Sequence, residues 1–363
     1  KKKKKLAAVT WLSYRVGKYR DLRIHVRGHR LYIGKDAMRR LKKKLLAEIE
    51  ESIPRIKLHP DLPPFSHRRL TQGMLFSGAT GSGKTQHMTP MLLAAAQDPG
   101  AKVFGYDNKG QLSAVIPGVE EGYTILLAPW DKRSPFWDIA TDINTPQRAR
   151  RFARFIVVAT KEEMWSNGAR MLLAAVIITL QNVKRTNWGF SDILAMINQI
   201  DSPHTTKLLI KYSPEVATFL QQTDNKTTGS MRSVLASYLT PISELSRVWP
   251  SSKGGFSIRK WLDEKSSIRN VIVQGSEEYA ELRDAISGAL MAIAASIIAS
   301  PTLAESDSRR LYFFADEFTQ LGKIPELIQL VAVGRSKGVI PIYGFQDVSQ
   351  VRQVYGEFDA QLP

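Results

Sequence analysis

The sequence predicts an α/β protein with a parallel sheet, into which an all-α domain is inserted. A glycine-rich loop near residue 80 joins a short apolar segment to a helical one. Strand-like and helical segments then alternate, except for about 100 residues in which only helical periodicity is found. The chain has 363 residues, of which 43% are hydrophobic and 23% are charged. This length and composition fit two or three globular domains and exclude a mostly disordered chain.

The positive charge is concentrated at the N-terminus. Residues 1–70 hold 21 Lys or Arg and six Asp or Glu, so they carry +15 of the net charge of +17. Such a basic arm attracts polyanions, either nucleic acid or the anionic face of a membrane, although a merely solvated surface is the alternative. The lysines at 1–5 are typical of a segment beside a membrane anchor, or are foreign to the natural protein. We expect the sequence to belong to a longer protein.

Cysteine and membrane-spanning segments are both missing from the sequence. Without cysteine there is no disulfide framework, thiolate metal site or cysteine nucleophile. The longest apolar runs, 171–180 and 286–300, are shorter than the ~20 residues of a spanning helix. We therefore interpret both runs as buried helices of a globular core.

The expected elements define four regions. At the start of the α/β domain, strands are expected at 73–78, 101–107 and 124–128 and a helix at 83–97. Apolar spacing predicts helices at 148–160, 166–182, 190–199 and 230–245. The alternation returns with strands at 269–273, 310–316 and 339–345 and helices at 276–300 and 325–336. The predicted regions are a basic arm with a proline-rich linker (1–70), the first segment of a nucleotide-binding domain (71–144), an inserted all-α domain (145–250) and the second segment of the nucleotide-binding domain (251–363).

The glycine-rich loop matches the complete P-loop pattern G-x-x-x-x-G-K-[ST]. Its residues are Gly78, Ala79, Thr80, Gly81, Ser82, Gly83, Lys84 and Thr85. The glycines let backbone N–H groups turn inward around phosphate oxygens, and the following helix adds its positive N-terminal dipole. Lys84 can reach the β- and γ-phosphates, and the Thr85 hydroxyl can bind Mg²⁺. A simple glycine-rich turn would not need the lysine, so we predict binding of ATP with Mg²⁺.

An acidic pair supplies the second half of a nucleotide site. Asp316 and Glu317 follow the apolar strand expected at 310–316, at the edge of the sheet where ligands of α/β proteins bind. Asp316 can position Mg²⁺. Glu317 can act as general base for the attacking water. A pair of carboxylates favours hydrolysis over binding alone.

Two further side chains are candidates for catalysis. Gln346 ends the next expected strand, and a neighbouring parallel strand would bring its amide to the γ-phosphate as a sensor; an ordinary polar strand end is the alternative. Arg335 ends the intervening helix, where a cation normally caps the helix. The sharper hypothesis is an arginine finger given to the nucleotide of a neighbouring subunit.

Four segments resemble one protein family over about residues 65–360. The chain resembles the cytoplasmic part of the type IV secretion coupling proteins, the TraD-type ATPases of bacterial conjugation. The resemblance rests on Tyr106-Asp-Asn-Lys-Gly110, on Leu127 to Asp138 with its Pro-x-Asp-x-Arg…Trp pattern, on Asp316 to Leu327 continuing through Gly334 to Gly338, and on Gln346 to Gln350 with Tyr355-Gly356.

The resemblance implies properties that composition and spacing do not show. It implies a RecA-like motor domain, a homo-hexamer around a channel, and an N-terminal anchor in the bacterial inner membrane with the motor on the cytoplasmic face. The implied cargo is single-stranded or double-stranded DNA, relaxase-bound single strands, or effector proteins, delivered to a type IV secretion channel. It also implies a trans-acting finger for Arg335 and a sensor for Gln346.

Two features depart from the family pattern, and two other functions stay open. The anchor is not in this sequence, and the last sheet strands of the family are expected beyond residue 363. A chromosome-segregation pump would share the P-loop and the acidic pair, but the all-α insertion argues against it. A docking adaptor whose nucleotide only controls assembly is the alternative without DNA pumping.

Overall fold

The computed structural model describes residues 32, 34–48, 56–57, 63–79, 81–159, 163–217, 220, 225–250 and 254–356. The chain divides into two compact units, Lys1–His67 and Arg68–Pro363. The lysines at 1–5, Thr80 and the last residues, 357–363, lie outside the described residues.

The described portion of the first unit centres on helix α2 (Gly34–Ala47). This helix carries basic side chains over most of its surface, while Leu45 is buried. The Arg40 guanidinium bonds Asp36 one turn earlier and lies over the Tyr32 ring, at 4.3 Å from its centroid. The proline-rich linker falls mostly outside the described residues. Within it, Phe65 N donates to Ile56 O across an antiparallel bridge.

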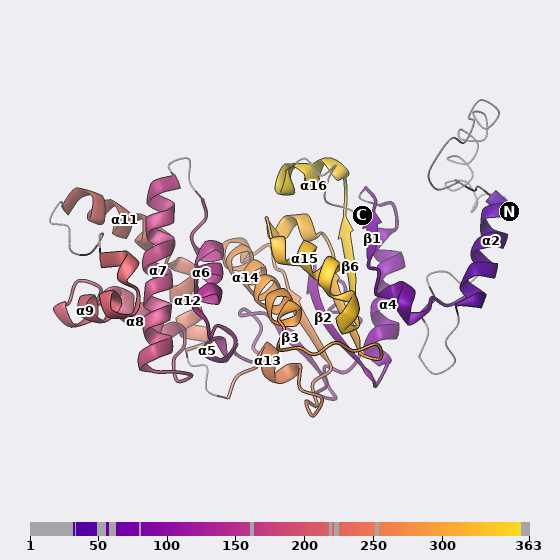
Figure 1. Cartoon of the computed structure of the whole chain (residues 1–363), viewed down its shortest axis with the longest axis horizontal. Helices are drawn as coiled ribbons and strands as arrows, with labels where there is room; N and C mark the ends of the chain where they lie inside the picture. The colour runs from indigo at the N-terminus through magenta and orange to yellow at the C-terminus, as the bar shows by residue number, and fades with distance from the viewer. Residues whose placement is uncertain are drawn as a thin grey trace. The chain divides into compact units, whose positions relative to one another are not determined.

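The second unit contains a six-stranded sheet in which every pairing is parallel (Figure 1). Its order is β1-β6-β5-β2-β4-β3. The strands are β1 (Met74–Ser77), β2 (Ala101–Asp107), β3 (Thr124–Leu127), β4 (Asn270–Gln274), β5 (Arg310–Ala315) and β6 (Val339–Phe345). The four inner strands are almost wholly buried, which explains their continuous apolar sequences. All predicted strands are present, and no strand end differs from its expected position by more than one residue.

Helices cover both faces of this sheet. Figure 1 shows α14 (Ala280–Ala299) and α15 (Pro325–Val333) on one side of the strands and α4 (Lys84–Gln97) on the other. Two neighbouring residues of β6 contact helices on opposite faces of the sheet. The Tyr343 hydroxyl donates to Leu327 O in α15, whereas a Cβ at Gly344 would meet Met88 of α4. The shorter helical segments of this body are α3 (His67–Leu70), α13 (Ile258–Trp261), η3 (Phe318–Leu321), η4 (Arg335–Lys337) and α16 (Val348–Tyr355).

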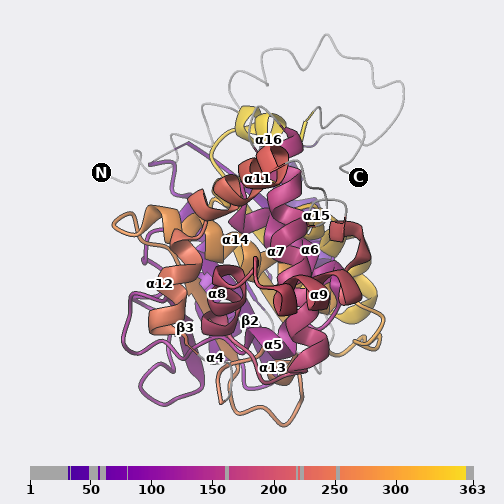
Figure 2. The same cartoon turned by 90° about the vertical axis from the view of Figure 1, so that its left-hand side faces the viewer.

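The helical block follows β3 in the chain and gathers at one end of the second unit (Figure 2). Its elements are α5 (Ile139–Asp142), α6 (Pro146–Ile156), α7 (Glu163–Val183), α8 (Phe190–Asn198), α9 (Pro203–Tyr212), η2 (Pro214–Val216), α11 (Asn225–Ser237) and α12 (Thr240–Val248). Together with the parallel sheet, this block confirms the predicted fold class. The single helix expected at 230–245 is wrong, because α11 ends at Ser237 and a new helix, α12, begins at Thr240 with Pro241 in its first turn. Helix α9 was not predicted.

Helix α14 joins the sheet to the helical block. A Cβ at Gly288 would meet the Phe155 ring of α6 at 2.7 Å and Leu321 O of η3 at 3.3 Å, so only glycine allows this three-way approach. Among the described residues, α14 is the one helix long and apolar enough to cross a membrane, and 78% of its apolar window is buried inside the protein. That burial is typical of the core helix of a globular domain.

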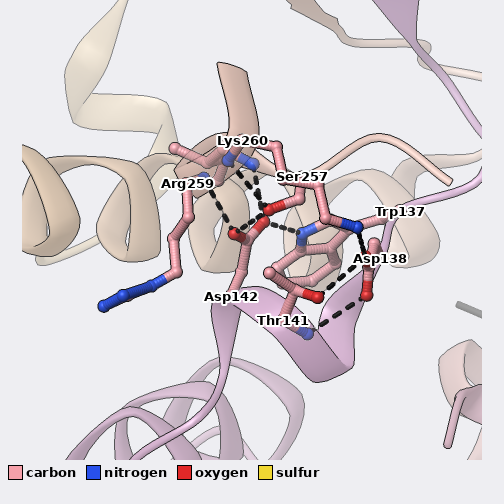
Figure 3. Close-up of polar contacts among 8 residues, drawn as sticks. Trp137, Asp138, Thr141, Asp142, Ser257, Arg259 and Lys260 are labelled. Atoms are coloured by element: carbon pink, nitrogen blue, oxygen red, sulfur yellow. Dashed lines mark hydrogen bonds and ion pairs between the residues drawn. The ribbon is translucent and has the colours of Figure 1, made fainter. Parts of the chain in front are cut away.

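The chain leaves and re-enters the sheet body through two segments that lie side by side at Trp137 and Phe256. The fully buried Asp142 carboxylate bonds both segments (Figure 3). Its four donors are Trp137 Nε1 at 2.8 Å, Ser257 Oγ at 2.7 Å, Ile258 N at 2.8 Å and Arg259 N at 3.0 Å. Burial raises the pKa of this carboxyl, although each of the four hydrogen bonds lowers it.

Asp138 adds a second polar link at the same junction. Its carboxylate caps α5 by accepting from Thr141 N and Oγ1, and it pairs with Lys260 Nζ at 2.7 Å (Figure 3). Because Asp138 and Asp142 lie where the chain enters the helical block and their partners Ser257 to Lys260 lie after it, the junction is closed by contacts across more than 110 residues of chain.

Candidate active site

The glycine-rich loop leads from β1 into α4 with the backbone shape that the motif predicts. Gly81 and Gly83 have φ of 81° and 89°, in the left-handed region that favours glycine. A Cβ at Gly78 would collide with Ser82 Oγ, so the loop closes tightly on itself there. Gly78 N donates to Phe345 O at 3.2 Å and ties the loop to β6. The loop backbone therefore lies at the start of α4, where the helix dipole favours an anion.

Lys84, the first residue of α4, contacts both members of the acidic pair. Its Nζ lies 2.7 Å from Glu317 Oε1 and 3.2 Å from Asp316 Oδ1, and its side chain is only 7% exposed. The contact to Glu317 is a hydrogen bond, whereas Asp316 Oδ1 is held as an ion pair without hydrogen-bond geometry. Residues 232 and 233 positions apart thus form one buried cluster, because β1 and β5 end at the same edge of the parallel sheet.

The Asp316 carboxyl is strongly affected by its surroundings. Burial raises its pKa and outweighs the Lys84 ammonium, which lowers it; Glu317 and Asp107 raise it further. Asp107 ends β2, the strand beside β5, and its Oδ2 accepts from both N and Oγ of Ser113. Asp107 was not predicted as a site residue. The sequence signal that could have identified it is a carboxylate at the end of another inner strand.

Glu317 has a backbone conformation that is rare for its residue type. Its φ of 57° and ψ of 46° are left-handed, and Arg185 is the one other non-glycine with positive φ in the described chain. Such a conformation costs about 1–3 kcal/mol and persists where neighbouring contacts determine it. Here it turns the side chain toward Lys84. The second oxygen, Oε2, is buried and accepts no hydrogen bond from the described residues.

Gln346 completes the cluster from the strand between the P-loop strand and the acidic strand. Its Nε2 donates to Glu317 Oε1 at 3.1 Å. Since β6 pairs with β1 on one side and β5 on the other, its carboxyl end opens between Lys84 and the acidic pair. The expected position of Gln346 beside the site is therefore observed.

Arg335 lies at the other end of the sheet. Helix α15 ends at Val333, and Arg335 belongs to the short turn η4, which the left-handed Gly338 ends. The expectation that Arg335 lies at the end of a helix reaching residue 336 is therefore wrong. Arg335 is exposed, and it precedes the amino end of β6. It lines an apolar groove with Gly73 and Met74 at the start of β1. The structure thus does not bring Arg335 to the cluster around Lys84 in the same chain.

Two further sequence candidates come from the P-loop pattern. Thr85, the second residue of α4, is partly buried beside Lys84. Thr80 lies outside the described residues. The site as described therefore consists of the loop backbone, Lys84, Thr85, the acidic pair and Gln346, with Asp107 behind Asp316.

The family of the chain is settled by its sequence. Residues 57–362 match the family described as the type IV secretion-system coupling protein DNA-binding domain. The chain belongs to this family. It is also 27% identical over 359 residues to the coupling protein TraD of Escherichia coli strain K12, covering 96% of this chain and 47% of TraD. The chain thus spans about half the length of this curated relative.

Solved structures of the coupling protein TrwB share the fold of this chain. TrwB in complex with the non-hydrolysable ATP analogue ADPNP superimposes with a TM-score of 0.71 at 23% identity, covering 93% of this chain and 77% of TrwB. TrwB in complex with ADP and Mg²⁺ gives 0.71 at 22% identity, covering 93% and 76%. The fold of this family member is therefore that of a RecA-like P-loop NTPase with an all-α domain.

Proposed function

We propose that this chain is the motor of a coupling protein, which hydrolyses ATP to move DNA and attached protein cargo toward a type IV secretion channel. One observation carries the proposal: a P-loop lysine, two carboxylates and a glutamine converge at the carboxyl edge of the sheet in a member of the coupling-protein family. Binding of nucleotide alone would not need the second carboxylate.

The chain's own residues divide the work of phosphoryl transfer. The loop N–H groups and the Lys84 ammonium stabilise charge on the transferred phosphoryl group. Glu317 accepts the proton of the attacking water, for which its buried and unbonded Oε2 is available. Gln346 holds Glu317 through its amide and orients that carboxylate toward the γ-phosphate.

The residues at the site also fit Mg²⁺. This ion prefers oxygen ligands, and Thr85 and Asp316 supply a hydroxyl and a carboxylate beside the phosphate loop. Asp316 Oδ1 is buried, lies 3.2 Å from the Lys84 ammonium and accepts no hydrogen bond from the described residues, so it has acceptor capacity left for a cation. When bound, Mg²⁺ neutralises charge on the β- and γ-phosphates.

The other regions have proposed roles around this motor. Residues 145–250 form an inserted all-α domain between the motor segments 71–144 and 251–363, and the basic residues 1–70 lie near the cytoplasmic face of a bacterial inner membrane or along DNA. The +15 charge of the arm supports both roles. Deletion of residues 1–44 separates them: a flatter salt dependence of DNA binding indicates a DNA arm, whereas lost binding to anionic vesicles indicates a membrane arm.

The decisive experiment measures ATP turnover of the assembled protein with and without single-stranded DNA. We expect turnover to rise when DNA is added, since a motor hydrolyses ATP as it translocates DNA. Turnover that ignores DNA, together with nucleotide-dependent assembly, would support a docking adaptor instead. Stimulation by duplex alone would favour a pump of the chromosome-segregation type.

A ring belongs to the proposal, because Arg335 cannot serve as a finger within its own chain. Its position at the amino end of β6, opposite the Lys84 cluster, supports a role for its guanidinium at the nucleotide of a neighbouring subunit. A cation supplied in trans contributes roughly 10³–10⁵ in rate where it has been measured. Arg335→Ala homo-oligomers and Lys84→Ala homo-oligomers should each be inactive.

Mixing the two variants tests the trans assignment. Mixed rings contain some interfaces with an intact P-loop on one side and an intact Arg335 on the other, so some of the activity should return. Rings shown to be mixed that stay inactive would count against the assignment. An active Arg335→Ala homo-oligomer would remove it.

A further inference from the structure

Two sequence motifs that the nucleotide site does not use meet in one pocket. The loop after β2 (Asn108 to Gly110) and the loop after β3 (Trp130 to Lys132) line a cavity of about 710 Å³ together with Gln274, which ends β4, and the loop 275–277 that follows it. All three loops leave the carboxyl edge of the sheet, the edge that carries the P-loop and the acidic pair. This pocket is called the three-loop pocket below.

Trp130, which lines the three-loop pocket, belongs to a stacked aromatic pair. Trp130 and Tyr279 lie parallel, with an interplanar angle of 4° and ring centroids 5.6 Å apart. Tyr279 precedes α14 and is 40% exposed, and Trp130 is partly exposed. A parallel, accessible pair of this kind offers a flat face on which a further planar ring can stack.

The charges around the pocket favour an anion. Each acid of the lining has a cationic partner. Asp131 pairs with Arg133 at 2.7 Å, and Glu277 pairs at 2.7 Å with Arg283, which also pairs with Asp284 outside the lining.

The two lysines of the lining are different. Lys109 and Lys132 are exposed, and neither ammonium group has an ion-pair partner among the described residues of the chain. The pocket therefore combines two unpaired positive charges with a stacking surface and the side-chain amide of Gln274.

The pocket is linked to the hydrolysis site through the end of β2. Asp316 N donates to Tyr106 O at 3.3 Å, and the Tyr106 hydroxyl donates to Asn108 Oδ1 at 2.8 Å in the pocket wall. Gly275 N donates to Asp107 O, and a Cβ at Gly275 would meet Asn108 O at 2.6 Å. Hydrogen bonds at the end of β2 thus connect the three-loop pocket with Asp316, the carboxylate proposed to bind Mg²⁺.

We propose that the three-loop pocket binds single-stranded DNA, with a base stacked on the Trp130–Tyr279 pair and its phosphates at Lys109 and Lys132. An acidic peptide would satisfy the lysines but would not use the aromatic face. A duplex keeps its bases stacked inside, so it cannot place one on the pair. The assignment rests on the proposed DNA motor and names where that motor touches its track.

The first test removes the stacking surface. Binding of a fluorescently labelled oligodeoxythymidine is measured by anisotropy on the full chain, for the wild type, Tyr279→Leu and Tyr279→Phe. Base stacking on an aromatic side chain corresponds to about 5- to 150-fold in affinity. Tyr279→Leu should therefore weaken binding at least about 5-fold, while Tyr279→Phe, which keeps the ring, should bind like the wild type. Equal affinities of the leucine and phenylalanine variants would overturn the stacking assignment.

The second test removes the two charges. The double variant Lys109→Gln, Lys132→Gln should lower the slope of log K against log salt by about 1.4, because each phosphate contact to a single strand contributes about 0.7. Lys265→Gln is the matched single-charge control for Lys132→Gln, since Lys265 is exposed in the loop that enters β4 at the amino edge. Equal slopes for Lys132→Gln and Lys265→Gln would show only general attraction and would overturn the pocket.

Further outcomes distinguish failure of the pocket from failure of the motor. If the wild type binds the oligonucleotide and its turnover is stimulated, but the pocket variants behave identically, only the pocket is wrong. If the wild type neither binds DNA nor responds to it, both proposals are wrong. Displacement of the oligonucleotide by free ATP from Lys84→Ala would overturn the polynucleotide in favour of a second mononucleotide site. Heparin, which has no bases, should bind Tyr279→Leu as tightly as the wild type.

Discussion

Asp142 at the junction and the Asp316–Glu317 pair at the sheet edge are all buried carboxylates, yet their oxygens are satisfied differently. Asp142 accepts four hydrogen bonds, two on each oxygen, from the backbone and from neutral side chains. Asp316 and Glu317 share one ammonium group, and each keeps a buried oxygen without a hydrogen bond.

Under the proposed function, this difference separates a carboxylate that holds the fold from two that act on a ligand. Buried polar groups in native proteins are normally hydrogen-bonded, so an exception requires an explanation. At Asp142 nothing is left for a ligand to satisfy. At the acidic pair, unused acceptor capacity faces the phosphate loop, as expected where a cation and a water must bind.

The sharpest test of this comparison is Glu317→Gln. The amide is close in shape but cannot take a proton from water, so turnover should fall by about 10²–10⁴. ATP binding and thermal stability should be kept, because the variant removes one of two carboxylates that compete for Lys84. Steady-state turnover, nucleotide binding by a fluorescent analogue and a melting curve check the three statements. Near-normal turnover would contradict the role of Glu317.

Asp142→Asn should show the opposite pattern. The amide presents a donor to at least one of the four groups that now donate, and leaving such buried donors unpaired should lower the free energy of unfolding by roughly 2–4 kcal/mol. Denaturant unfolding measures this loss. Turnover of the folded protein at low temperature should stay within a few-fold of the wild type. A stable variant without activity would place Asp142 in the chemistry instead.

A smaller effect is expected for the single hydrogen bond from Trp137, which Trp137→Phe removes. The change deletes the Nε1 donor together with part of the buried indole, while Asp142 retains three of its hydrogen bonds. The lost bond should lower the free energy of unfolding by about 1–2 kcal/mol, and the smaller ring adds the cost of a cavity. In a double-mutant cycle with Asp142→Asn, the double variant should lose less free energy of unfolding than the sum of the losses in the two single variants, because both changes remove the same bond. Strict additivity would show that the bond contributes nothing.

The smallest expected effect is a shift in the acid limb of activity. Burial raises the pKa of Asp316, so this carboxyl takes up its proton at a higher pH than an ordinary aspartate at about 3.9. The pH profile of kcat/KM for ATP should therefore lose activity above that value as the pH falls. Stability has the opposite sign: the native state holds this proton to a higher pH than the unfolded chain, so the free energy of unfolding decreases as the pH rises between the two pKa values. An acid limb at the ordinary value would contradict the shift.

The sequence predicted the portions of this site that local patterns specify. Lys84 and the acidic pair were found because each follows a buried strand within a few residues, and parallel strands bring their carboxyl ends together. Gln346 followed from the same rule applied to β6. The fold class was predicted because helical and strand periods differ clearly over whole segments.

The missed features depend on long-range contacts or on backbone detail. Nothing near Asp142 indicates that its donors come from residues 257–259, more than 110 positions later. Helix α9 has few apolar residues at helical spacing, and its existence depends on Leu209 packing into the block. The left-handed backbone of Glu317 also has no sequence signal, since glycine or asparagine would be the expected residue there.

That backbone has a consequence for how this protein can evolve. Glycine at 317 would relax a conformation that costs the native state about 1–3 kcal/mol, and such a variant would outcompete the wild type in any selection for folding yield alone. The same variant would have no group to accept the proton of water. Populations grown without a need for transfer should therefore accumulate substitutions at this position sooner than at its neighbour Phe318, whose buried ring contacts Tyr343 and Phe345. Loss of the glutamate would then be an early molecular sign that the proposed ATP hydrolysis is no longer under selection in a lineage.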